Sequence, residues 1–425
     1  MMAWMALAPA MAWGQNPGVS YAPPSSPLPV PIGSTRPEDG GFFVDAQFTF
    51  FHMTNPLKPQ QVAVRGLIDR DGTIAGQAGQ FLGSGQEALN VSQLTKSDTY
   101  VPGTNLGMGW KFRNGSSLSV NFLMFAEASY RAGATLIPRA GTLDPNFANS
   151  FLFADVHNIP PQFAGPDFKV LFPFPRVPVT MLPLLQPGNH PTPSPILLTI
   201  PVGLVPFPII QPSPQAAFGI WNGASIMTID FTQRFQQWDL IYREPIFETE
   251  TYRLNGMVGP RFAWIWERFA WRTTSIAAFG NSGPADVGLY STTASNRMYG
   301  AAAGCEQEYY LGHGVVLHLK LQGSLFVDIV KENAKYESGD KFNGLPENKR
   351  AKNLWSFVPE ADTTVGIMWY PTEFVQLYAG YEVMGFLNTL AGRRPIDFDY
   401  SNLDPHYSHT ARLFNGFHGG IAFTF

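Results

Sequence analysis

The densest group of side chains with metal-binding chemistry lies near the end of the chain. Within thirteen residues it holds five potential ligands: Asp397, Asp399, Asp404, His406 and His409. Carboxylate oxygens and imidazole nitrogens bind divalent cations, so such a group could hold one. The same residue types, mixed with Ser, Asn and Pro, also set turn geometry in a solvated loop. We favour the turn-rich loop and expect no metal and no other cofactor.

Catalytic motifs are scarce. The chain contains neither a Gly-x-Ser-x-Gly nucleophile motif nor a His-Glu-x-x-His motif. Gly107 and Gly109 form a Gly-x-Gly pair inside a strand-like run, where we interpret them as strand glycines. The residues two positions from His418 are Gly416 and Gly420, so no serine lies beside it on one strand face. We therefore expect that the protein is not an enzyme.

Charged side chains also occur at alternate positions of apolar runs. Since lipid tolerates no charge near its midplane, we expect nine of them to face the lumen of a barrel: Lys111, Arg113, Glu127, Arg131, Arg253, Arg261, Lys320, Asp328 and Glu382. Whether they line a pore or fill a plug depends on barrel width.

The elements that would position these side chains are strands, because period-two alternation dominates and long helical stripes are absent. Asn114-Gly115 predicts a type I′ turn between two alternating runs. Ten runs are predicted as strands: 42–51, 104–113, 117–131, 218–232, 251–266, 297–310, 315–330, 355–370, 374–385 and 411–425.

The connections between these runs alternate between long and short. Bacterial barrels have an even number of strands, short periplasmic turns and longer external loops. The predicted fold is therefore all-β: a transmembrane antiparallel up-and-down barrel of about ten strands, within a range of roughly 8–14. It would occupy residues 41–425.

The last run carries a possible assembly signal. Phe417, Ile421, Phe423 and Phe425 share one face, and the sequence stops on an aromatic residue. We expect this face to be read by the outer-membrane assembly machinery and to contact outer-membrane lipid.

Composition narrows the function classes further. Charged residues make up 14% of the chain, against roughly 25% in soluble proteins. The net charge of −4 gives no basic footprint for nucleic acid. A single cysteine, Cys305, excludes an intrachain disulfide.

Three segments stand apart from the barrel. Residues 1–14 are apolar and end in small residues, which predicts a signal peptide whose true start lies upstream, since a basic region is missing. Residues 15–40 read as a Pro/Ser-rich linker. Residues 132–217 form a long external loop that is rich in both Pro and large apolar residues. We expect this loop to fold over the barrel mouth or onto a surface partner.

Several short motifs resemble the β-barrel porin-7 family of bacterial outer-membrane proteins. They are FFVDAQFTFFHMTNPLKPQQVAVRG from residue 42, LGMGWKF at 106–112, NRMYGAAAG at 296–304, FVPEADTTVGIMWYPTEFVQLYAGYEVMGFLN at 357–388, and Arg394-Pro395-Ile396-Asp397. The resemblance covers most of 42–131 and 218–425 and implies a barrel in the bacterial outer membrane. It supplies no catalytic or binding residues.

Three functions remain open at this point. The first is a narrow porin-like channel for small solutes, and the second is a closed structural or surface-display barrel. The third is a secreted all-β surface protein, which extraction from membranes would separate from the other two.

Overall fold

The computed structural model describes residues 41–69, 76, 80–94, 100–136, 151–159, 224–275, 286–339, 347–372 and 374–425, with short pieces between 169 and 221. The predicted signal peptide 1–14 and linker 15–40 lie outside the described residues. In the part described, no helix is long and apolar enough to cross a membrane.

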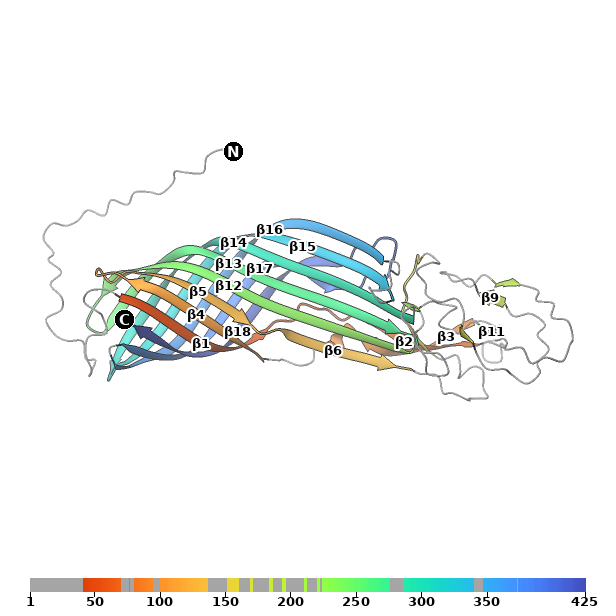
Figure 1. Ribbon diagram of the computed structural model, residues 1–425, viewed down its shortest axis with the longest axis horizontal. Helices are drawn as coiled ribbons and strands as arrows, with labels where there is room; N and C mark the ends of the chain where they lie inside the picture. The colour runs from red at the N-terminus through yellow and green to blue at the C-terminus, as the bar shows by residue number, and fades with distance from the viewer. Residues whose placement is uncertain are drawn as a thin grey trace, which may run out of the picture.

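Ten antiparallel strands close into one long barrel (Figure 1). One of the ten is interrupted and consists of β5 (Ser117–Phe125) and β6 (Ala128–Thr135), which both pair with β12. The other nine are β1 (Gly41–Met53), β4 (Tyr100–Lys111), β12 (Ile226–Glu248), β13 (Tyr252–Thr274), β14 (Val287–Gly312), β15 (Val315–Ser338), β16 (Glu347–Thr372), β17 (Val375–Arg394) and β18 (His406–Thr424). The ring closes where β1 pairs with β18, from Phe43 opposite Thr424 to Met53 opposite Phe414.

The two ends of the barrel differ in their connections. At one end, here called the turn end, two or three residues join β12 to β13, β14 to β15 and β16 to β17. Gly41 and the chain end also lie there, and the Phe425 amide donates a hydrogen bond to the Phe42 carbonyl at 2.8 Å. Five residues, 112–116, join β4 to β5 at the same end, and the still longer connections lie at the opposite loop end (Figure 1). Turns of bacterial barrels face the periplasm, so the loop end faces outward.

The strands are longer than the sequence pattern predicts, and the end of β12 lies furthest from its predicted position. We expected a strand over 218–232 followed by a connection over 233–250, whereas β12 continues to Glu248. Its inward face changes from Phe235 to Gln237 and Asp239, and its outward face from Arg234 to Trp238. Polar residues thus face outward in the first part of β12 and inward in the second. The alternation of polar and apolar residues is therefore interrupted although the strand continues.

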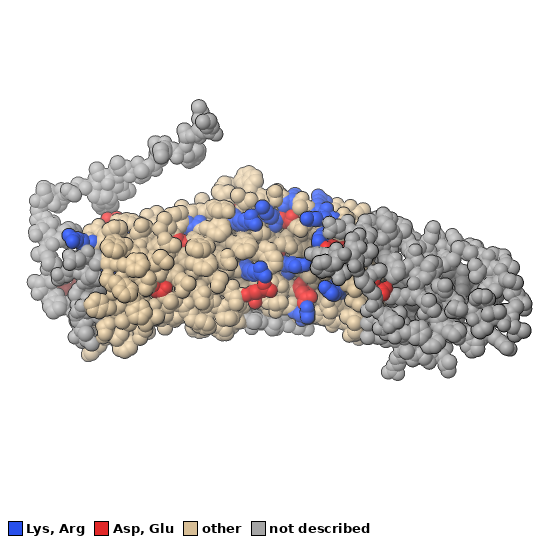
Figure 2. Space-filling model, in the orientation of Figure 1, with Lys and Arg blue, Asp and Glu red and all other residues tan. Residues whose placement is uncertain are grey.

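The outer wall carries an apolar belt. On β15 the outward side chains from Leu317 to Ile329 are apolar, apart from Gly323, and the next outward residue is Lys331. With a rise of about 3.3 Å per residue and a tilt near 40°, this stretch spans about 30 Å, the thickness of a hydrocarbon core. Figure 2 shows the turn-end half of the barrel nearly free of charge and Lys and Arg gathered toward the loop end.

Further elements lie at the loop end. β2 (Gln61–Asp69), β3 (Gln80–Asn90) and β7 (Phe151–Phe153) form a small sheet, and η1 (Val91–Leu94) is a single 3₁₀ turn. Two short pairs join β8 (Lys169–Val170) to β11 (Ile210–Gln211) and β9 (Pro183–Leu185) to β10 (Pro193–Pro195). The rest of the Pro-rich loop is mostly outside the described residues, so its packing over the mouth stays a prediction.

Candidate functional site: the barrel lumen

The turn-end half of the lumen holds a network of charged side chains centred on Arg261 of β13. Its guanidinium donates to Asp239 of β12 at 2.7 and 3.1 Å, and to both carboxylate oxygens of Glu360 of β16 at 3.0 and 2.9 Å. A further bond of 2.7 Å reaches Gln322 of β15. The Arg261 side chain has no solvent exposure. Because β13 and β16 are not neighbours, these contacts connect separate parts of the wall through the lumen.

Further ion pairs extend this network. Lys320 of β15 donates to Asp362 of β16 at 2.9 Å. Glu306 of β14 contacts Arg243 of β12 at 3.1 Å and His318 of β15 at 2.7 Å. Opposite charges thus neutralise one another where a wide channel would carry water.

An aromatic layer crosses the middle of the lumen. Six phenylalanines, none more than 4% exposed, form it: Phe51, Phe125, Phe235, Phe326, Phe386 and Phe414. Phe235 of β12 and Phe386 of β17 lie five strands apart in either direction around the barrel, yet their ring centroids are 5.8 Å apart. Phe414 contacts both, at 4.9 and 5.6 Å. At these distances aromatic rings are in contact, so the layer joins opposite walls.

A buried ion pair lies among these aromatic residues. Arg412 of β18 donates to Glu267 of β13 at 2.5 Å, and Gln233 of β12 donates to the other Glu267 oxygen at 2.8 Å. β13 and β18 also lie on opposite sides of the ring. This pair is a second connection across the lumen.

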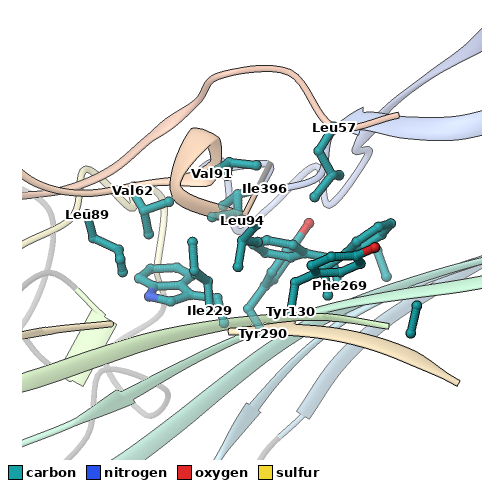
Figure 3. Close-up of a cluster of buried hydrophobic side chains, with 14 of the residues drawn as sticks. Leu57, Val62, Leu89, Val91, Leu94, Tyr130, Ile229, Phe269, Tyr290 and Ile396 are labelled. Atoms are coloured by element: carbon teal, nitrogen blue, oxygen red, sulfur yellow. The ribbon is translucent and has the colours of Figure 1, made fainter. Parts of the chain in front are cut away.

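Loop segments fill the outer mouth. Figure 3 shows Leu57, Ile396 and η1, with Val91 and Leu94, packed over side chains of the barrel strands. Those strand side chains are Tyr130, Ile229, Phe269 and Tyr290. Hydrogen bonds fix the arrangement: the Tyr290 hydroxyl donates to the Pro395 carbonyl at 2.8 Å, and the Gln60 amide donates to the Ile396 carbonyl at 2.7 Å. The described parts of the first and last long connections therefore fold inward over the mouth.

Most of the charged residues expected in the lumen lie on its side of the wall. Arg261, Asp328 and Glu382 are buried or nearly so. Lys320 and Arg253 also lie on the lumen side, where each forms an ion pair. The Lys111 ammonium lies over the ring of Phe43, an inward residue of β1, at 5.9 Å. Arg113 lies in the exposed turn after β4.

Glu127 and Arg131 differ from the expectation and lie on the outer surface. Arg131 is 76% exposed and pairs with Asp230, while Glu127 pairs with Arg234. The cause is the break at 126–127 between β5 and β6, which shifts the alternation by one residue. Phe125 and Ala128 are both buried, so the residues after the break present the opposite face.

The alternation within a single strand predicted for many residues whether they face the lumen or the outside. It did not predict which residues of other strands they contact. Glu360 and Asp362, which hold Arg261 and Lys320, were not predicted as lumen residues although they alternate with Ala361 inside a predicted run. The six phenylalanines were missed because an inward apolar residue looks like a lipid-facing one in sequence. The one sequence feature that could have revealed the inward phenylalanines is a change from apolar to polar residues along one face of a strand, as in β12.

The residues of the expected assembly signal lie on the outer face of β18. Phe417, Phe423 and Phe425 are 60%, 39% and 71% exposed. Their recognition by assembly machinery stays a prediction.

The acidic cluster of the last loop organises turns. Asp397 accepts hydrogen bonds from the amides of Asp399, at 3.0 Å, and Asp404, at 2.7 Å. Asp399 accepts bonds from Asn158 and Ser401, and these hold the pKa of its carboxyl below the ordinary value. Among the described residues, no group of three His, Cys, Asp or Glu could hold a metal ion. The side chain of His406 lies outside the described residues, and His409 contacts the Asn388 carbonyl at 3.2 Å.

Comparison with protein families gives one match. Residues 75–401 match the family described as Legionella pneumophila major outer membrane protein precursor. The chain belongs to this family. The expected barrel and its outer-membrane location are thereby confirmed, and the match is consistent with the resemblance to a family of outer-membrane β-barrels. A comparison with curated proteins finds no match.

Solved outer-membrane proteins share low structural similarity with the chain. The outer-membrane protease OmpT of Escherichia coli is 9% identical with a TM-score of 0.35, covering 91% of this chain and 97% of that one. The Pseudomonas putida toluene transporter TodX is 7% identical with a TM-score of 0.19, covering 91% and 90%. A loop-deletion mutant of Vibrio cholerae OmpT is 8% identical with a TM-score of 0.17, covering 91% and 99%. Similarities this low transfer neither proteolysis nor transport to this chain.

Proposed function

We propose that this member of the major outer membrane protein family is a structural barrel that displays its loops at the cell surface. Its lumen is closed to small hydrophilic solutes, and it has no enzymatic activity. The observation that carries the proposal is the aromatic layer, because Phe235, Phe386 and Phe414 join opposite walls in the middle of the barrel.

The physical reason is the cost of passage. A hydrated ion that enters the layer must give up water among side chains that offer no hydrogen bonds, and dehydration of an ion in such surroundings is costly. The ion pairs of Arg261 below the layer and the inward loops above it add two further barriers in series.

A narrow porin-like channel is the second candidate. The charged turn-end half of the lumen favours it, since a purely structural plug could be apolar throughout. Conduction through it requires the aromatic layer and the loop segments to move.

Planar-bilayer currents from refolded protein separate the two candidates. We expect silence from the natural sequence. The double variant Phe235→Ala and Phe414→Ala should give current steps, because it removes two rings that contact each other and their neighbours. The matched control is Phe48→Ala with Phe357→Ala, which removes two outward rings that are 60% and 55% exposed and should stay silent.

Regular steps from the natural sequence would overturn the closed barrel and establish the channel. In that case Arg253→Glu or Arg261→Glu should change ion selectivity. Faster gel migration of unheated samples would first show that each preparation is folded.

A further inference from the structure

A basic patch lies on the outer wall directly beyond the apolar belt. It consists of Arg268 of β13, Arg297 of β14 and Lys331 of β15, all on outward positions. Lys331 lies opposite Ser295, and Ser295 lies opposite Trp266. Arg268 and Arg297 are each two residues from this row on the same face. Arg268 is displaced toward the loop end and Arg297 toward the turn end. With strands about 4.8 Å apart and about 3.3 Å per residue, the backbone positions of the three cations therefore span about 14 Å.

None of the three cations makes a hydrogen bond or an ion pair through its side chain in the described part of the chain. The nearest outward carboxylate on the adjoining strand, Asp230 of β12, is already paired with Arg131. The outward positions of β13 and β14 hold no Asp or Glu, and those of β15 hold none before Glu337, which pairs with Lys335. On the adjoining part of the wall, by contrast, Arg131 and Arg234 are each paired with a carboxylate. The three positive charges are therefore left for an external anion.

The position of the patch indicates what kind of anion this is. Arg297 lies opposite Trp264 on one side and Ile329 on the other. Ile329 and Tyr299 are 44% and 51% exposed and belong to the end of the lipid-facing belt. An occupant of this place touches apolar side chains with one part and three cations with the other. A soluble anion satisfies only the second requirement.

We propose that the patch binds the phosphate groups of a glycolipid of the outer leaflet, namely lipopolysaccharide. Its acyl chains cover Leu325, Val327 and Ile329, and its phosphates accept hydrogen bonds from Arg268, Arg297 and Lys331. The two guanidiniums suit this role because their planar forks match phosphate oxygens in pairs.

Binding of lipopolysaccharide to the refolded barrel in neutral detergent tests the proposal. Each basic residue near a membrane surface strengthens anionic-lipid binding roughly five-fold, so the variant Arg268→Gln, Arg297→Gln and Lys331→Gln should bind about 100-fold more weakly. Raised salt should weaken binding to the natural sequence more than to the variant. Gel mobility of unheated samples shows that the variant is folded.

Two further probes identify the source of the phosphate. Dephosphorylated lipopolysaccharide should bind the natural sequence as weakly as the triple variant binds the intact lipid. Inorganic phosphate at millimolar concentration should not displace the lipid. Equal binding by the folded variant and the natural sequence would overturn the proposal, and so would full displacement by inorganic phosphate. The matched control Arg131→Gln with Arg234→Gln removes two outward cations that already have carboxylate partners and should leave affinity within a few-fold.

Discussion

The Arg261 guanidinium donates to five oxygen atoms on three strands, all within 3.1 Å, and the side chain is fully buried. Burying two opposite charges together is close to neutral in free energy, whereas removing one of them leaves the other buried and unpaired. Substituting Arg261 should therefore lower the free energy of unfolding strongly, even though the intact ion pair contributes little net stability.

We expect Arg261→Met to lower the free energy of unfolding by about 3–5 kcal/mol, because Glu360 and Asp239 lose their cation. The measurement is the urea midpoint at which the fast-migrating folded band disappears. The matched control is Arg131→Met, whose side chain is 76% exposed and whose loss should leave the midpoint nearly unchanged. Equal midpoints for the two variants would contradict the role of the network.

Asp399 links the order of the last loop to pH. Its pKa is lowered in the folded protein by hydrogen bonds from Asn158 and Ser401. A carboxyl with a lowered pKa contributes stability that is present above its unfolded pKa of about 3.9 and is lost as the pH falls through the folded value. Acid should therefore loosen the loop.

Hydrogen exchange of residues 400–403, corrected for intrinsic rates, measures this effect. We expect exchange to be faster at about pH 3 than at about pH 6 in the natural sequence. In Asp399→Asn the difference between the two conditions should shrink. An identical pH dependence in both proteins would show that another group is responsible.

At the scale of the elements, β18 closes the barrel. It pairs with β1 on one side and β17 on the other, and its last residues lie opposite Phe43 and Val375. An unpaired edge in lipid leaves backbone groups without partners, which the bilayer does not tolerate. Closure therefore depends on the end of this strand.

Deletion of Phe423 to Phe425 should leave periplasmic, protease-sensitive material. It removes the last paired positions and two outward aromatic rings. Fractionation with carbonate washing measures insertion, and Phe247→Ala serves as control because it removes another exposed ring at the turn end. Normal insertion of the shortened chain would refute the assembly role of this strand.

The strands themselves were the part most open to prediction from sequence. All ten were found because a lipid-facing side chain and a lumen-facing one alternate, as in β15 from Val315 to Val330. Loop-end parts of the other strands were missed because both faces become polar there, as in β15 beyond Ile329, with Lys331 outside and Glu332 inside. In β12 the turn-end part was missed instead. Residues in the loop-end parts lie beyond the apolar belt, so apolar and polar side chains do not alternate along them.

The lumen was less predictable because its contacts join strands that are distant in sequence. Nothing local in β13 shows that Arg261 meets Glu360, which lies 99 residues further on. The break between β5 and β6 reversed the side taken by Arg131, and one unpaired step is invisible to a periodic pattern. Inward aromatic residues such as Phe386 were indistinguishable from lipid-facing ones.

At the scale of the whole molecule, the barrel is longer than a membrane is thick. On β15 the eight residues from Lys331 to Ser338 follow the apolar belt; all of them pair with β14, and those up to Glu337 also pair with β16. At about 3.3 Å per residue and a tilt near 40°, they raise the loops about 20 Å above the hydrocarbon boundary. The loops are thus held clear of the headgroups by a rigid hydrogen-bonded wall. If the barrel displays its loops as proposed, we expect antibodies, which are too bulky to enter the inner sugar layer, to bind intact cells through them.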